Sequence, residues 1–162
     1  MTSASKYLAT YLNDHYAGAT GGLALARRAA SENEGSELGA FLSELADEIE
    51  ADRATLGEIM GALGVGTDRT KVIAALVFER VGRLKPNAQL RGYSPLSPLV
   101  ELEVLGLGIR GKLALWRALG EVADTPPLDG EQLAELAARA ERQVADVEAR
   151  RLEVARLALA PR

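Results

Sequence analysis

Apolar residues recur every three or four positions over four long stretches of this chain, and this period limits the possible folds more than any other feature. The stretches run from about 5 to 34, 37 to 63, 98 to 124 and 130 to 159. Such spacing places side chains on one face of an α-helix, whereas a half-buried strand alternates with period two. No alternation of that kind extends over a useful length. The sequence therefore predicts an all-α fold with four long amphipathic helices.

Each stretch has its own predicted inward-facing line. The first line is Leu8, Leu12, His15, Ala19, Gly22 and Ala26, and the second is Leu38, Leu42, Leu45, Ile49, Asp52, Leu56, Ile59 and Leu63. The third line is Leu102, Leu105, Ile109, Leu113, Trp116 and Leu119, and the last is Leu133, Leu136, Ala140, Val144, Val147, Arg151 and Val154. Three polar residues, His15, Asp52 and Arg151, thus stand on otherwise apolar lines.

Glycine, proline and short polar residues mark the helix ends. Ser36, Ser97 and Asp129 precede helical stretches and are predicted to cap them, with Pro98 in a first turn. A shorter helix is expected from about 69 to 84, followed by an irregular crossover. The run Gly18, Gly21 and Gly22 costs a helix about 1 kcal/mol per glycine relative to alanine, so we expect a neighbouring backbone to pack closely there.

Composition narrows the functional classes. The chain has 162 residues, consistent with a single domain over 1–162, and it contains no cysteine and one histidine. These counts exclude disulfides, thiolate metal sites and a multi-histidine metal site within one subunit. A net charge of −4 with 4% aromatic residues argues against nucleic-acid binding.

The sequence contains no signal peptide and no apolar run long enough to span a membrane, so we expect a cytoplasmic protein.

The number and lengths of the predicted helices, with the crossover after the second long one, resemble the ferritin-like superfamily. The runs YLNDHYAGA at 11–19 and GIRGKLALWR at 108–117 also resemble small uncharacterised actinobacterial ferritin-like proteins. The resemblance implies a four-helix bundle whose long crossover carries a short extra helix. It covers about 5 to 159.

Di-iron members of this superfamily use a glutamate from each of two helices and a Glu-x-x-His motif from each of the other two. Here the first such motif reads Ile49-x-x-Asp52, and the last helix has Glu141 followed by Val144 where histidine is needed. His15 stands where a glutamate would be, and Glu101 or Glu103 could supply a carboxylate. The loss of ligands favours a non-enzymatic interaction or structural module, without cofactor, that forms a homodimer or binds an unknown protein partner.

Two alternatives remain open. The first is an enzyme or sensor with a reduced site for iron or manganese, built from His15, Asp52, Glu101 and Glu141. The second is a carrier of a small apolar ligand between the helices.

Structural roles are the competing interpretation of the same polar residues. His15 would then hydrogen-bond a carboxylate such as Asp52 or Glu101, and Asp52 would pair with Arg53 or Arg151. On this interpretation Glu141 and Glu148 belong to a solvated flank of the last helix. Lys112 is expected to extend from an edge of the bundle into solvent, with a reactive buried amine as its alternative.

Overall fold

Four long helices make up most of the protein. The structure is a computed structural model, and it describes residues 5–73, 93–124 and 126–160. The helices are α1 (Lys6–Glu32), α2 (Glu37–Ala62), α4 (Ser97–Gly120) and α5 (Gly130–Leu159). A further helical turn occupies 69–73, and the rest of the predicted short helix lies outside the described residues. The described part of the chain has no strand, so the all-α prediction is confirmed.

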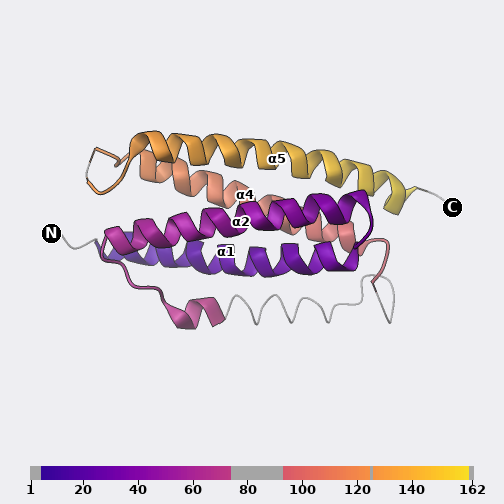
Figure 1. Cartoon of the computed structure of the whole chain (residues 1–162), viewed down its shortest axis with the longest axis horizontal. Coiled ribbons are helices and arrows are strands. Elements are labelled where there is room, and N and C mark those ends of the chain that lie inside the picture. Colours follow the sequence, from indigo (N-terminus) through magenta and orange to yellow (C-terminus); the bar gives the residue numbers. More distant parts are fainter. Residues whose placement is uncertain (1–4, 74–92, 125, 161–162) are drawn as a thin grey trace.

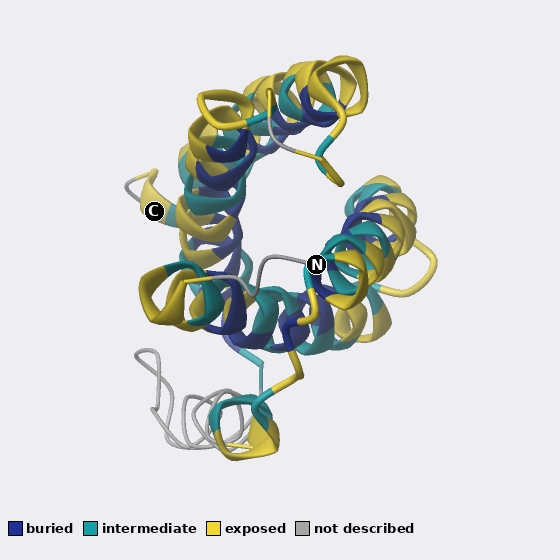
Figure 2. Cartoon of the chain, turned by 90° about the vertical axis from the view of Figure 1, so that its left-hand side faces the viewer, coloured by how far each residue is buried: buried dark blue, intermediate teal, exposed yellow. Residues whose placement is uncertain are grey.

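The long helices lie side by side along the length of the molecule (Figure 1). α1 packs on α2, α4 packs on α5, and α1 also packs on α4, whereas α2 and α5 approach each other at only a few positions. Seen end-on, the buried faces of the helices point toward a shared interior (Figure 2). α2 ends near one end of the molecule and α4 begins near the other (Figure 1). The end of α2 and the start of α4 are therefore separated by the length of the bundle.

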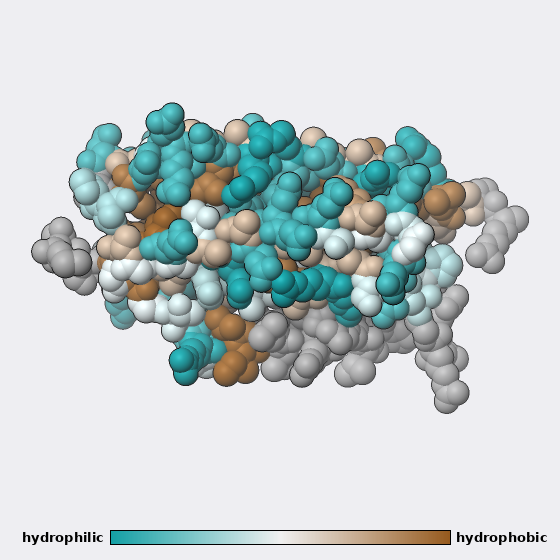
Figure 3. Space-filling view, viewed as in Figure 1, coloured by the Kyte–Doolittle hydropathy of each residue, from teal (hydrophilic) through white to brown (hydrophobic). Residues whose placement is uncertain are grey.

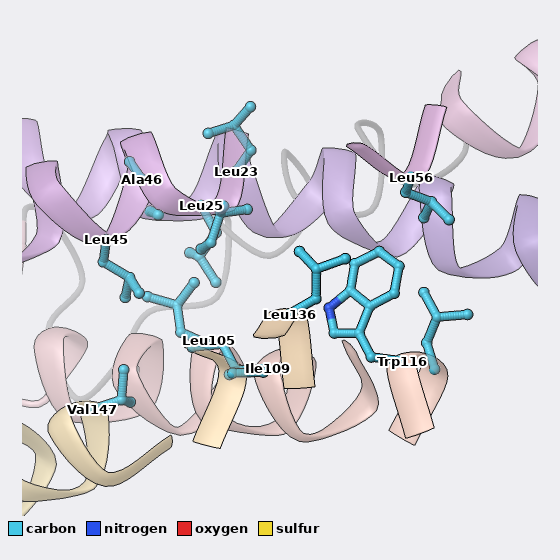
Figure 4. Packing of buried hydrophobic residues seen from close by; sticks show 14 of the residues in the cluster. Leu23, Leu25, Leu45, Ala46, Leu56, Leu105, Ile109, Trp116, Leu136 and Val147 are labelled. Carbon is cyan, nitrogen blue, oxygen red and sulfur yellow. The ribbon is translucent and has the colours of Figure 1, made fainter. Parts of the chain in front are cut away.

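One core is shared by all four helices. It includes Leu12 of α1, Leu56 of α2, Trp116 of α4 and Leu133 of α5, none more than 2% exposed. Figure 4 shows the indole of Trp116 beside Leu136 of α5 and facing the helix that carries Leu56. By contrast, the outer face drawn in Figure 3 is mostly hydrophilic. The apolar faces of the amphipathic helices therefore form the core, and their polar faces form the surface.

Side-chain caps fix two helix starts as predicted. Ser36 Oγ accepts a hydrogen bond from the Gly39 amide at 3.0 Å, and the Asp129 carboxylate accepts from two amides of α5. The prediction for Ser97 is wrong, because Ser97 is the first helical residue and the cap position is Leu96, without a side-chain bond. Ser97 Oγ instead accepts from the Ser94 amide at 3.2 Å. It therefore stabilises the turn that leads into α4.

The buried face of α1 differs from its predicted line. Ala17, Thr20 and Leu23 are buried, whereas the predicted Ala19 and Gly22 are only half-buried. The reason is that α1 packs against both α2 and α4, so its buried face turns toward two neighbours. The expected close approach at the glycines is also wrong for Gly18 and Gly22, since a Cβ there would meet nothing within 4 Å.

A buried amide fastens the segment that follows α2. Asn13 of α1 is 8% exposed, and its Nδ2 donates to the Gly66 carbonyl at 3.0 Å. The Asp68 amide donates to Asn13 Oδ1 at 2.6 Å. This amide thus positions the chain where it leaves α2.

None of the helices in the described part combines the length and the apolar character that crossing a membrane requires.

Candidate functional site

Asp52 lies at the point where three helices meet. It interrupts the apolar line of α2 and is 2% exposed. One carboxylate oxygen accepts a hydrogen bond from Lys112 Nζ of α4, and the other accepts from the guanidinium of Arg139 of α5. A buried carboxylate requires such partners because its desolvation is costly. Asp52 therefore joins α2 to α4 and α5 through charge.

The contacts continue beyond Asp52 into a chain of five polar residues. Lys112 also donates to Gln143 Oε1, and Gln143 Nε2 donates to Glu48 Oε2 at 2.7 Å. Glu48 and Asp52 lie four residues apart on α2, as do Arg139 and Gln143 on α5, so each pair shares a helix face. We call Glu48, Asp52, Lys112, Arg139 and Gln143 the central ion network. It holds two carboxylates and two cations, and its charges balance.

Lys112 is the more enclosed of the two cations in the central ion network. Its side chain is 13% exposed. Burial lowers the pKa of this amine below its ordinary value, and the neighbouring Asp52 opposes that change. The expectation that Lys112 reaches out into solvent is therefore wrong. The reason is its spacing from Ile109 and Trp116, which places it on the inward face of α4.

Glu101 belongs to a different cluster, at the start of α4. Arg28 of α1 donates to Glu101 Oε1 at 2.7 Å, and the Tyr93 hydroxyl donates to Oε2 at 2.5 Å. Asn33 Nδ2 in turn donates to the Tyr93 hydroxyl at 2.9 Å. Burial raises the pKa of Glu101, against the opposing effects of Tyr93 and Arg28. This cluster fastens the end of α1 to the start of α4.

His15 is half-buried on α1 and makes an edge-on contact with the Tyr11 ring, with 4.6 Å between ring centroids. Burial lowers the pKa of the imidazole, and the charge of Asp14 opposes this. The expected hydrogen bond from His15 to Asp52 or Glu101 is absent, although all three residues lie in the described part. Both carboxylates are held by other donors.

Glu141 lies on the outside of α5. It pairs with Arg117 at 2.7 Å, and both side chains are more than half exposed. Glu148 makes two 2.7 Å hydrogen bonds with Arg151, and these bonds lower the pKa of Glu148. Surface pairs of this kind add little stability. The two glutamates thus match the interpretation of a solvated flank.

The four candidate ligands do not converge on one metal site. Among the described residues, no three histidine, aspartate or glutamate side chains gather closely enough to hold a metal ion. Iron or manganese would need free carboxylate oxygens facing one cavity. At Asp52 and Glu101 those oxygens already accept hydrogen bonds from Lys112, Arg139, Arg28 and Tyr93. The residues present do not fit a di-metal centre.

Sequence reasoning found Asp52 but not its partners. Of the two expected arginines, Arg53 lies over the Tyr16 ring at 5.7 Å and Arg151 binds Glu148, so neither pairs with Asp52. Arg139 and Gln143 were missed. Their four-residue spacing, with Gln143 one position before the predicted Val144, was the signal in the sequence that could have revealed them.

A second feature is a surface groove between α4 and α5, with a volume of about 290 Å³. We call it the α4–α5 groove, and its lining residues are Leu102, Glu103, Gly106, Leu107, Arg110, Val147, Glu148 and Arg151. Its floor is apolar and its rim carries two acidic and two basic side chains. Several of these side chains are exposed, so the groove opens to solvent rather than lying inside the bundle.

The two features differ in what they can do. The central ion network positions helices and leaves Lys112 bound to Asp52, while the α4–α5 groove offers an accessible apolar surface. Comparison of the chain with models of protein families, with curated proteins and with solved structures finds no match.

Proposed function

We propose that the chain is a ferritin-like four-helix bundle that works without a di-metal centre, as a non-enzymatic interaction or structural module of the cytoplasm. The order of the helices supports the bundle: α1 pairs with α2 and α4 with α5. The opposite positions of the α2 end and the α4 start fit a bundle with one long crossover (Figure 1). The helical turn at 69–73 fits a short extra helix within that crossover.

The observation that carries the proposal is the pairing of Asp52. Its two oxygens are taken by Lys112 and Arg139, so cations of the chain itself neutralise the carboxylate inside the bundle. A metal would have to displace both, leaving two buried or half-buried cations without their partner. The network therefore replaces the charge that a metal ion would supply.

The same contacts argue against a catalytic amine at Lys112. A nucleophilic lysine needs a free amine next to a space for substrate. Lys112 Nζ donates to both Asp52 and Gln143, and it is not among the residues that line the α4–α5 groove. We therefore assign Lys112 a structural role.

The other two functions considered from the sequence have less support. The reduced metal site needs His15, Asp52, Glu101 and Glu141 in one place, and these residues have separate partners. An apolar-ligand carrier needs an enclosed apolar chamber, whereas the α4–α5 groove has charged residues on its rim. The acidic net charge of −4 also gives no support to nucleic-acid binding.

Elemental analysis tests the proposal. The untagged protein is purified from cells grown with added iron, manganese and zinc, and its metal content is compared with that of His15→Ala. We expect far less than one ion per chain in both proteins, and the same melting temperature with and without a chelator. A stoichiometric ion in the wild type that is lost in His15→Ala would establish the reduced metal site instead.

A further inference from the structure

The α4–α5 groove has an apolar floor beside an exposed apolar side chain. Leu102 and Val147 are 1% and 2% exposed and form part of the floor, while Leu107 is 70% exposed. Gly106 keeps the floor open: a Cβ placed there would lie 3.6 Å from Val147 Cγ1 and 3.7 Å from an Arg110 nitrogen. The surface therefore presents a hollow and a projecting leucine in adjacent positions of one helix.

Charge on the rim follows the same helix face. Glu103, Gly106, Leu107 and Arg110 are spaced three, four and seven residues apart, so they lie together on α4. Glu148 and Arg151 of α5 complete the rim and are already bound to each other. Glu103 is 3.6 Å from Arg151, and the charge of Arg110 helps to lower the pKa of Glu148, although no ion pair of Arg110 within 4 Å is found among the described residues.

The face of α4 formed by these residues is complementary to the same face of a second copy of the chain. When two copies of α4 cross antiparallel about a two-fold axis between positions 106 and 107, Glu103 of each copy faces Arg110 of the other. The same axis places Leu107 of each copy opposite Gly106 of the other, over the hollow. An isologous dimer requires this relation, in which residue i meets j and j meets i. Opposite charges at the rim would then fix the register.

We propose that the α4–α5 groove is the docking site for a second copy of this chain, with the two α4 helices antiparallel and Leu107 inserted into the groove of the other copy. This inference rests on the proposed function, because it assigns the surface through which the interaction module associates. The two are tested separately. A monomer without bound metal would refute the dimer and leave the proposed function intact. A protein that binds metal stoichiometrically would refute the proposed function, whether it is a monomer or a dimer.

Analytical ultracentrifugation across a range of micromolar concentrations tests the docking site. We expect the wild type to sediment with twice the 17.2 kDa mass of the chain. Leu107→Glu should raise the dissociation constant at least about 100-fold, since a central apolar anchor is replaced by a charge. Leu157→Glu is the matched control, because Leu157 is 85% exposed on α5 outside the groove and its change should leave the dimer intact.

Charge reversal tests the antiparallel register. Glu103→Arg and Arg110→Glu should each weaken association about tenfold by placing like charges opposite each other. The double variant restores both pairs and should return close to the wild-type constant. Circular dichroism checks that every variant keeps its helix content.

Three results would overturn the proposal. A wild type that stays monomeric at the highest concentration would leave the groove without a second copy. A dimer that persists in Leu107→Glu would use another face. A double variant as weak as the single variants would refute the antiparallel pairing.

Discussion

At the scale of single residues, Asp52 is the side chain on which the interior depends most. Its carboxylate is buried between Lys112 and the half-buried Arg139, and removing one partner of such a pair leaves an uncompensated charge inside the protein. The chain also offers a matched surface pair, Arg27–Glu50, on α1 and α2, with side chains 55% and 45% exposed. Comparing the Asp52 pairs with the Arg27–Glu50 pair therefore separates the effect of burial on stability from the effect of the ion pair itself.

We predict that Asp52→Ala destabilises the protein by about 3–5 kcal/mol, because Lys112 and Arg139 lose their counter-charge. Glu50→Ala, on the same helix, should cost no more than about 1 kcal/mol. Urea denaturation followed by circular dichroism measures both. Equal losses in the two variants would mean that the Asp52 pairs are worth no more than a surface salt bridge.

His15 is the only histidine, so its titration can be followed without overlap. Burial lowers its pKa below the ordinary 6.5, so as pH falls the unfolded chain takes up the proton first. The stability from neutral His15 is therefore complete above about pH 6.5 and is lost as pH falls through the folded pKa.

We predict that the free energy of unfolding falls less between pH 7.5 and 5 in His15→Gln than in the wild type, because glutamine does not titrate. The carboxylates titrate in both proteins and cancel in the comparison. Nuclear magnetic resonance of the imidazole should give a midpoint below 6.5. An imidazole midpoint at or above 6.5, with a wild-type free energy of unfolding that falls no more than that of His15→Gln, would contradict the prediction.

At the scale of helices, two glycines have opposite roles. Gly39 lies in the first turn of α2, where a Cβ would come within 2.2 Å of the Asn33 carbonyl oxygen. At Gly22 in α1 a Cβ would meet nothing within 4 Å. The first glycine is required by a close backbone approach, and the second only weakens its helix.

We predict that Gly22→Ala stabilises the protein by up to about 1 kcal/mol through helix propensity. Gly39→Ala should destabilise it by about 1–3 kcal/mol, as expected for overpacking at a site that cannot move freely. Thermal melts of the two variants measure these effects. Stabilisation by Gly39→Ala would show that the turn between α1 and α2 relaxes at little cost.

The sequence predicted the helices better than their contacts. The 3.6-residue period and the caps Ser36 and Asp129 are local signals, so the bounds of α2 and α5 agree with prediction within one residue. Asp52 was recognised because it breaks an apolar line. Its partner Arg139 was not, because several arginines stand near inward faces and only the rotation and register of packed helices decide which one reaches Asp52.

At the scale of the whole molecule, α2 and α5 are neighbours whose backbones come close at only a few positions. Side chains bridge that gap through the Arg139–Asp52 and Gln143–Glu48 contacts. The buried cluster nevertheless takes residues from all four helices, so neither the α1–α2 pair nor the α4–α5 pair has a core of its own. A shared core is the condition for cooperative unfolding of a small domain.

Trp116 provides a probe for that cooperativity, because it is the only tryptophan and is 1% exposed within the shared core. Its fluorescence reports on α4 and its neighbours, while circular dichroism reports on all helices equally. We predict that the two signals change with the same urea midpoint and slope, since exposing Trp116 also exposes Leu56 on α2 and Leu136 on α5 (Figure 4). Loss of helix signal before any change in fluorescence would show that α1 and α2 unfold as a separate unit.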